Sequence, residues 1–213
     1  MSPNISGTNG IVVSANSSTD VVILRNLRIN GIGTGLNGIR FLSGKALFVE
    51  NCDIFGFTQN GIDIATAGGK VFLTNDNLQN NSQNGLNVQS TANTFVSILH
   101  STFNLNNNGV FAGNFSRITV NYSEASGNTT AGFIAAPTAG TAELNVSNST
   151  SANNAVGIQA GNGTTTALVR VSANIIHDNS SSGFAIGTLG TINSAGENFN
   201  SSGGAPNATT VPQ

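Results

Sequence analysis

The sequence predicts an all-β fold, a right-handed parallel β-helix of about eight coils of 23–28 residues with three short strands per coil. Three features lead to this prediction. A glycine followed by an apolar residue recurs once per coil, apolar and polar residues alternate in short runs, and no segment keeps a helical period. Alternation with a period of two is typical of strands with one buried face.

The glycine repeat sets the length of one coil. Successive glycines are 28, 23, 24, 24, 23, 25 and 26 residues apart. Asparagine precedes the first five of them, at Asn9, Asn37, Asn60, Asn84 and Asn108. Asn-Gly is a turn signal because both residues tolerate positive φ, so we expect a turn there. The eight glycines are Gly10, Gly38, Gly61, Gly85, Gly109, Gly132, Gly157 and Gly183.

Each coil is expected to contain three strands with apolar residues pointing inward. In the second coil these are Ile39 and Phe41 on the first strand, Leu47 and Val49 on the second, and Ile54 on the third. One coil alone does not bury enough apolar surface to offset the entropy of ordering it, so the coils must stack.

A polar position recurs between the second and third strands. Equivalent residues of adjacent coils lie about 4.8 Å apart, so their side chains are predicted to stack and their amides to bond to one another. His100 falls in this column, and its role is interpreted as structural because no carboxylate shares its register. The predicted ladder is Asn26, Asn51, Asn75, His100, Tyr122 and Asn148, followed by Ala173.

Opposite charges one coil apart provide a test of this alignment. Four pairs are predicted to lie on adjacent coils: Arg25–Glu50, Arg28–Asp53, Arg40–Asp63 and Arg117–Glu143.

The composition excludes several classes of function. Charged residues make up 8% of the 213 residues and the net charge is −2, so the chain lacks the basic surface that nucleic acid requires. The single Cys52 excludes an internal disulfide and a cysteine-based zinc site. No apolar run approaches the roughly 18 residues of a membrane span, so no membrane insertion is expected. No metal or cofactor is predicted.

The chain is expected to form one domain, with a lead-in at 1–8, the β-helix at 9–200 and a polar tail at 201–213 that folds over the last coil. The start of the chain shows neither a charged leader nor an apolar signal region, so no signal peptide is expected in it. At the other end of the β-helix, the first coil presents apolar residues, and no polar segment like the tail is expected to cover them. We therefore expect a homodimer through Ile11, Val13, Val22 and Leu24.

The segments GIRFL at 38–42 and VENCDI at 49–54 resemble the pectin-lyase-like superfamily of parallel β-helices, and more closely the bacterial right-handed β-helix repeat proteins. The resemblance covers nearly the whole chain. It implies an exported bacterial protein, secreted or at the cell surface, whose segment before the first coil is missing here. The activity of that group is not established.

Catalytic motifs of the superfamily are not matched. The glycosidases of this superfamily contain the motifs Asn-Thr-Asp, Asp-Asp, Gly-His-Gly and Arg-Ile-Lys. This chain has Ser18-Thr19-Asp20 and Arg117-Ile118-Thr119 at best, and it has neither Asp-Asp nor Gly-His-Gly. Trp, often used to stack sugars, is absent. A polysaccharide lyase or glycoside hydrolase remains an alternative for which no catalytic residue can be named.

The favoured function is a non-catalytic surface module that contacts a polysaccharide. Outward positions on the first strands form a candidate ligand-binding stripe: Arg40, Asp63, Asn87, Phe111, Ile134 and Gln159. A second outward stripe, Ile23, Phe48 and Phe72, is apolar and suggests a covering segment or a partner. A third alternative, an ice-binding solenoid, is disfavoured because the outward residues vary from coil to coil.

Overall fold

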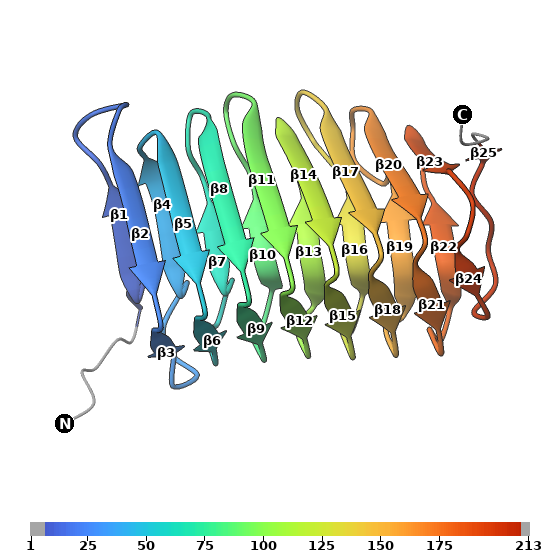
Figure 1. Cartoon of the computed structure of the whole chain (residues 1–213), viewed down its shortest axis with the longest axis horizontal. Coiled ribbons are helices and arrows are strands. Elements are labelled where there is room, and N and C mark those ends of the chain that lie inside the picture. Colours follow the sequence, from blue (N-terminus) through green and yellow to red (C-terminus); the bar gives the residue numbers. More distant parts are fainter. Residues whose placement is uncertain (1–6, 210–213) are drawn as a thin grey trace.

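The computed structural model describes residues 7–209 of the chain. These residues form 25 β-strands and no helix, arranged as three parallel sheets along one axis (Figure 1). Each coil adds one strand to every sheet. The all-β solenoid with three strands per coil and about eight coils is therefore confirmed.

The strands of each sheet are separated in sequence by about one coil. The first sheet consists of β1 (Ile11–Ser14), β4 (Ile39–Ser43), β7 (Ile62–Ile64), β10 (Asn84–Val88), β13 (Asn108–Ala112), β16 (Ala131–Ala135), β19 (Val156–Ala160) and β22 (Ser182–Ile186). The second consists of β2 (Val21–Arg25), β5 (Ala46–Glu50), β8 (Gly69–Thr74), β11 (Thr94–Leu99), β14 (Ser116–Asn121), β17 (Ala142–Ser147), β20 (Ala167–Ser172), β23 (Gly190–Ser194) and β25 (Ala208–Thr209). The third consists of β3 (Arg28–Asn30), β6 (Asp53–Phe55), β9 (Asn77–Gln79), β12 (Thr102–Asn104), β15 (Glu124–Ser126), β18 (Thr150–Ala152), β21 (Ile175–His177) and β24 (Phe199–Asn200).

The core is a column of inward side chains that runs through the stack. Ile39, Phe41, Leu47, Val49 and Ile54, the inward residues predicted for the second coil, are fully buried. Parallel pairing places the same positions of the next coils directly against them, so every interior coil is covered on both sides.

The four predicted ion pairs are present, which confirms the coil alignment. They are Arg25 Nε–Glu50 Oε2 at 2.6 Å, Arg28 Nε–Asp53 Oδ2 at 3.2 Å, Arg40 Nε–Asp63 Oδ2 at 3.1 Å and Arg117 Nη2–Glu143 Oε1 at 3.7 Å. Glu143 also contacts Arg170 at 3.2 Å and so links three coils. Such exposed pairs stabilise a fold by only about 0–1 kcal/mol each.

The glycine column is required by close packing between coils. None of the eight glycines has a positive φ, and neither do the asparagines before them, so the predicted positive-φ turn was wrong. A Cβ on Gly85 would lie 2.7 Å from the carbonyl oxygen of Gly109 and 3.0 Å from Asn106 Nδ2. The same contact with the next glycine carbonyl recurs along the column. Glycine is therefore selected because no side chain fits between the coils.

The predicted asparagine ladder exists, but other residues form it. Asn128 Nδ2 donates to Asn154 Oδ1 at 2.9 Å and to the carbonyl oxygen of Phe103 at 3.0 Å, and Asn128 Oδ1 accepts the amide N–H of Asn106 at 2.9 Å. This buried ladder joins Asn81, Asn106, Asn128, Asn154 and Asn179. A second one joins Asn9, Asn37, Asn60, Asn84 and Asn108, which precede the glycines.

The column predicted as the ladder lies at the turn between the second and third sheets. Its residues Asn26, Asn51, Asn75, His100, Tyr122 and Asn148 are exposed and have φ values of 48–57°. No hydrogen bond joins the side chains of Asn26, Asn51 and Asn75, while His100 and Tyr122 stack with ring centroids 5.3 Å apart. Asparagine is favoured there because it tolerates the left-handed conformation. Ala173 has the same conformation.

The hydrogen bonds of this turn run through the residue that follows each of these positions. Cys52 N–H donates to Asp76 Oδ1 at 2.8 Å, and Asp76 N–H donates to Ser101 Oγ at 3.1 Å. The column continues through Ser123, Ser149, Asn174 and Asn198. The prediction was therefore displaced by one residue, because the left-handed turn points its first side chain outward and its second inward.

The predicted apolar stripe on the second sheet is in register. Ile23 pairs with Phe48 and Phe48 with Phe72 on adjacent strands. The rings of Phe48 and Phe72 are stacked, with centroids 4.6 Å apart and an interplanar angle of 12°.

At the first coil the inward side chains, apart from the buried Val13, are less covered than elsewhere. Val22 and Leu24 are half-buried, whereas their partners Leu47 and Val49 are fully buried. Self-association through this coil stays a prediction. We expect the apparent mass in light scattering to rise with concentration for the wild type and to stay that of a monomer for Ile11→Lys, because a charge at this face opposes apolar contact.

The described part of the tail lies on the last coil, as predicted. Gly183 N–H donates to the carbonyl oxygen of Gly203 at 2.8 Å, and Asn207 Oδ1 accepts the N–H of Ile192 at 2.7 Å. Residues 208–209 add a short strand, β25, to the edge of the second sheet, which the sequence pattern did not predict. Of the predicted lead-in and tail, residues 1–6 and 210–213 lie outside the described residues.

Candidate functional site

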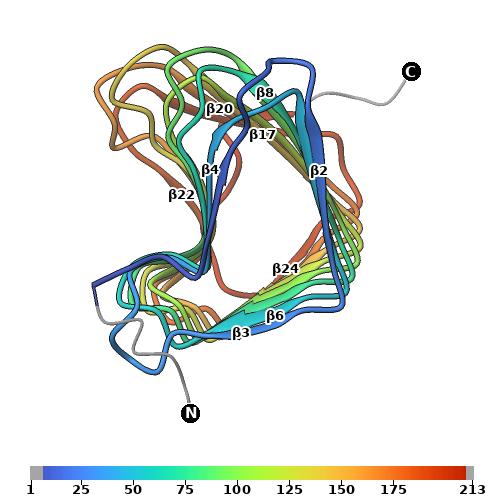
Figure 2. The same cartoon turned by 90° about the vertical axis from the view of Figure 1, so that its left-hand side faces the viewer.

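The outward face of the first sheet brings the predicted stripe together. In Figure 2 this sheet, marked by β4 and β22, lies between turns that project past it on both sides. Successive strands pair in register at the middle of the face, so their outward side chains, one from each coil, form a single line. We call this line the first-sheet row: Arg40, Asp63, Asn87, Phe111, Ile134 and Gln159.

At one end of the first-sheet row, a carboxylate is held by two neighbours. Asp63 Oδ2 lies 3.1 Å from Arg40 Nε, and Asp63 Oδ1 accepts a hydrogen bond from Asn87 Nδ2 at 2.8 Å. The Arg40 Nε is buried and its N–H is not aimed well enough at Asp63 to make a hydrogen bond, so the contact is an ion pair only. The Arg40 side chain is 41% exposed and the Asp63 side chain 10%. The groups within reach of a ligand are therefore donors.

Side chains of the row are more buried than expected for residues that point outward from a sheet. Asp63, Ile134 and Gln159 are only 7%, 6% and 7% exposed. The sequence could not show this burial, because it depends on how far the neighbouring turns project beside the sheet. Phe111 is half-buried, and the amide of Gln159 makes no hydrogen bond to any other described residue. Gln159 thus keeps donors and an acceptor for a ligand.

The acid–base chemistry of a glycoside hydrolase would need a second carboxyl group beside Asp63. Asp63 is the single carboxylate of the row, and its two oxygens already have partners. Within residues 7–209, no three His, Cys, Asp or Glu side chains lie close enough to hold a metal ion together.

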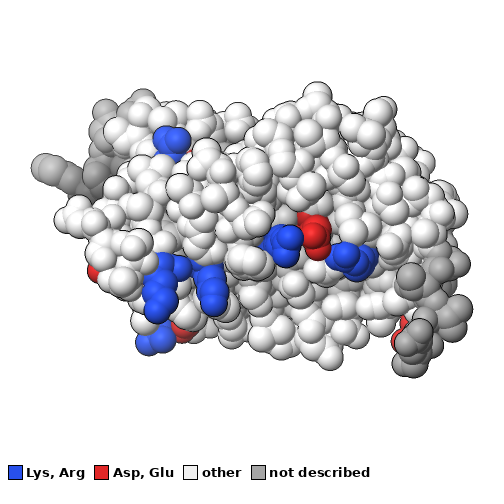
Figure 3. All heavy atoms as spheres, turned by 90° about the horizontal axis from the view of Figure 1, so that it is seen from above, with Lys and Arg blue, Asp and Glu red and all other residues white. Residues whose placement is uncertain are grey.

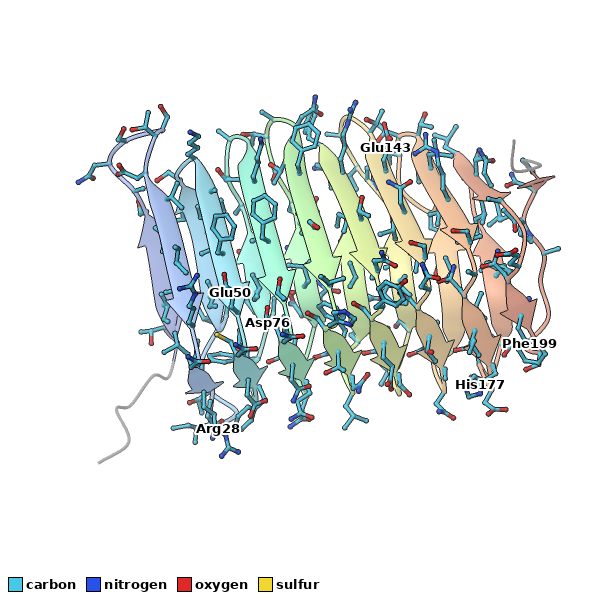
Figure 4. The ribbon with its side chains drawn as sticks, viewed as in Figure 1. Arg28, Glu50, Asp76, Glu143, His177 and Phe199 are labelled. Carbon is cyan, nitrogen blue, oxygen red and sulfur yellow. The ribbon has the colours of Figure 1, made fainter. Side chains whose placement is uncertain are left out.

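The acidic group with a strongly shifted pKa lies away from the row. Burial raises the pKa of Asp76 to about 6, against hydrogen bonds from the Cys52 and Thr74 amides that lower it. Burial also raises the pKa of the neighbouring Cys52 thiol. In Figure 4, Asp76 lies where the second sheet turns into the third. These groups belong to the hydrogen-bonded column of that turn.

One line of residues on the outward face of the second sheet, beside the predicted apolar stripe, went unrecognised in the sequence. On the second sheet, Lys70, Phe95, Arg117 and Glu143 occupy one line across four strands. Together with Phe72, Ser97, Thr119 and Asn145 they line an open depression of about 750 Å³. The signal that could have revealed this line is the first outward residue of each second strand, aligned from coil to coil.

The family comparison agrees with the geometry. A model of the right-handed β-helix region matches residues 4–145. No curated protein and no solved structure matches the chain. The described residues contain no helix of the length and apolarity needed to cross a membrane. The three parallel sheets and the coil repeat agree with this match. The chain therefore belongs to the right-handed β-helix family.

Proposed function

We propose that the protein is a non-catalytic module of an exported bacterial protein and that it holds a polysaccharide along the first-sheet row. The observation that carries the proposal is the row itself, which lines up hydrogen-bonding groups and an aromatic ring on consecutive coils. Saccharides present hydroxyls at their edges and apolar C–H groups on their faces. Arg40, Asn87 and Gln159 suit the hydroxyls, and Phe111 suits a ring face.

Lyase or hydrolase activity is the alternative from another class of function. Glycoside hydrolysis commonly needs two carboxyl groups on either side of the scissile bond. The row offers Asp63 alone, held by Arg40 and Asn87. This arrangement favours binding over proton transfer. Export is supported by the family resemblance, and a cell-surface location would bring the row to extracellular glycans.

The test is a glycan array followed by calorimetric titration of the glycans that bind. We expect Gln159→Ala to weaken binding by about two- to tenfold while leaving the fold intact, since a hydrogen bond between neutral groups contributes about 0.5–1.5 kcal/mol. Gln79→Ala, on the outward face of β9, is the matched control and should bind as the wild type does.

Two results would contradict this function. The first is a glycan that binds equally well to Gln159→Ala and to the wild type. The second is calcium-dependent release of unsaturated products from pectate that Asp63→Asn abolishes, which would show a lyase.

A further inference from the structure

The basic residues are distributed unevenly over the solenoid. Arg25, Arg28 and Arg40 each face a carboxylate on the next coil. On the second sheet, by contrast, Lys70 has no acidic partner in the described chain, and Glu143 is shared between Arg117 and Arg170. Seen from above, basic side chains flank an acidic one on a mostly uncharged surface (Figure 3). Three cations and one carboxylate give a local charge of 3 − 1 = +2, on a chain whose net charge is −2.

An exposed aromatic ring lies between two of these cations. Lys70 pairs with Phe95 on one side, and Phe95 pairs with Arg117 on the other, so the backbones of both basic residues lie one strand spacing, about 4.8 Å, from that of Phe95. Phe95 is 47% exposed, and the Arg117 guanidinium carbon lies 5.8 Å from the ring centroid. The ring face and the cations are therefore presented together.

Polar side chains complete the surface beside this line. Ser97, Thr119 and Asn145 pair in register on β11, β14 and β17, and they border the same depression of about 750 Å³. Arg170 Nη1 donates to Asn145 Oδ1 at 3.2 Å, which fixes that amide. In Figure 4, Glu143 is labelled near the upper end of β17, a strand of the second sheet. We define the second-sheet patch as Lys70, Phe95, Ser97, Arg117, Thr119, Glu143, Asn145 and Arg170.

We propose that the second-sheet patch binds a glycan whose sugar rings carry anionic groups. A sugar ring stacks on Phe95, its carboxylate or sulfate contacts Lys70 and Arg117, and its hydroxyls bond to Ser97 and Thr119. The positive local charge selects the anionic polymer, and the aromatic ring and hydroxyls select a saccharide. A flat lipid surface fits less well, because the depression is recessed and has polar side chains along it. This site is separate from the first-sheet row and does not depend on its function.

The experiment titrates the whole chain with polygalacturonate, chondroitin sulfate and neutral dextran at two salt concentrations. We expect binding of at least one anionic glycan, no binding of dextran, and weaker binding at high salt. Lys70→Gln and Phe95→Ser should each weaken binding by about tenfold, as the loss of an ion pair or an aromatic contact does. Circular dichroism checks that both variants fold.

The controls separate this site from the rest of the surface. Arg25→Gln makes the same change of charge on the same sheet outside the patch, and Phe199→Ser removes an exposed ring on the third sheet. Both should bind as the wild type does. The proposal is overturned if no anionic glycan binds, if Arg25→Gln weakens binding as much as Lys70→Gln, or if Gln159→Ala alone abolishes it. Binding to vesicles of anionic phospholipid with the glycans inert would also overturn it, in favour of a membrane surface.

Discussion

Replacing Gly85 by alanine is expected to lower the free energy of unfolding by about 3 kcal/mol, the upper end of the range typical of overpacking in a close-packed core. The new methyl group would lie 2.7 Å from the carbonyl oxygen of Gly109 and 3.1 Å from a carbon of the Phe103 ring. Neither atom is the end of a flexible side chain, so the two coils must separate. That separation also lengthens the neighbouring bonds of the asparagine ladder at Asn106.

The measurement is urea unfolding followed by circular dichroism, with Gly33→Ala as the matched control. Gly33 has a φ of 72°, and no atom lies within 4 Å of the position that a Cβ would take there, so its substitution tests backbone strain without a clash. Such strain costs about 1 kcal/mol. If Gly85→Ala costs no more than Gly33→Ala, close approach of the coils is not the reason for the glycine column.

The sequence was sufficient to predict the repeat, because each coil repeats the same inward positions. Ile39 and Leu47 recur as apolar residues at a nearly constant spacing, and that spacing fixes which coils are neighbours. Arg28 and Asp53 are then one coil apart, and their contact follows from the alignment. In a solenoid, contacts between residues far apart in the sequence are thus contacts between matching positions of neighbouring repeats.

Side-chain direction within the turns could not be read from the repeat. Asn75 and Asp76 recur equally well as columns, yet the left-handed conformation of Asn75 turns its side chain to solvent and leaves Asp76 buried. The pattern of residue types favours asparagine both in left-handed turns and in amide ladders. Only the backbone conformation decides between these two uses.

The burial of the first-sheet row has a similar origin. The outward direction of Asp63 and Gln159 follows from strand alternation, and the structure agrees with it. How much solvent reaches them depends on the turns on either side of the sheet, whose shapes vary with small changes in length. The depression beside Phe95 likewise depends on side chains from four strands.

Asp76→Ser is expected to stabilise the protein at pH 8 and to leave its stability nearly unchanged below pH 4. Burial raises the pKa of Asp76 from 3.8 to about 6 in the folded state, and the nearby carboxylate of Glu50 adds to the increase. Because the folded pKa is above the unfolded one, the folded state loses stability as the pH rises from about 4 to about 6. The loss is about 3 kcal/mol, at about 1.36 kcal/mol per pKa unit.

Serine is the fitting replacement because the same column already uses it. Ser123 Oγ accepts the N–H of Ser101 at 3.1 Å, and Ser149 Oγ accepts the N–H of Ser123 at 3.2 Å. A serine at position 76 would accept the N–H of Cys52 in the same way without a charge. The stability of both proteins is measured by urea unfolding between pH 4 and pH 8. Glu197→Gln, at an exposed carboxylate with a φ of 58°, is the control and should show little difference between the two pH values. A stabilisation by Asp76→Ser that is equal at pH 4 and pH 8 would show that ionisation of the buried carboxylate does not cause it.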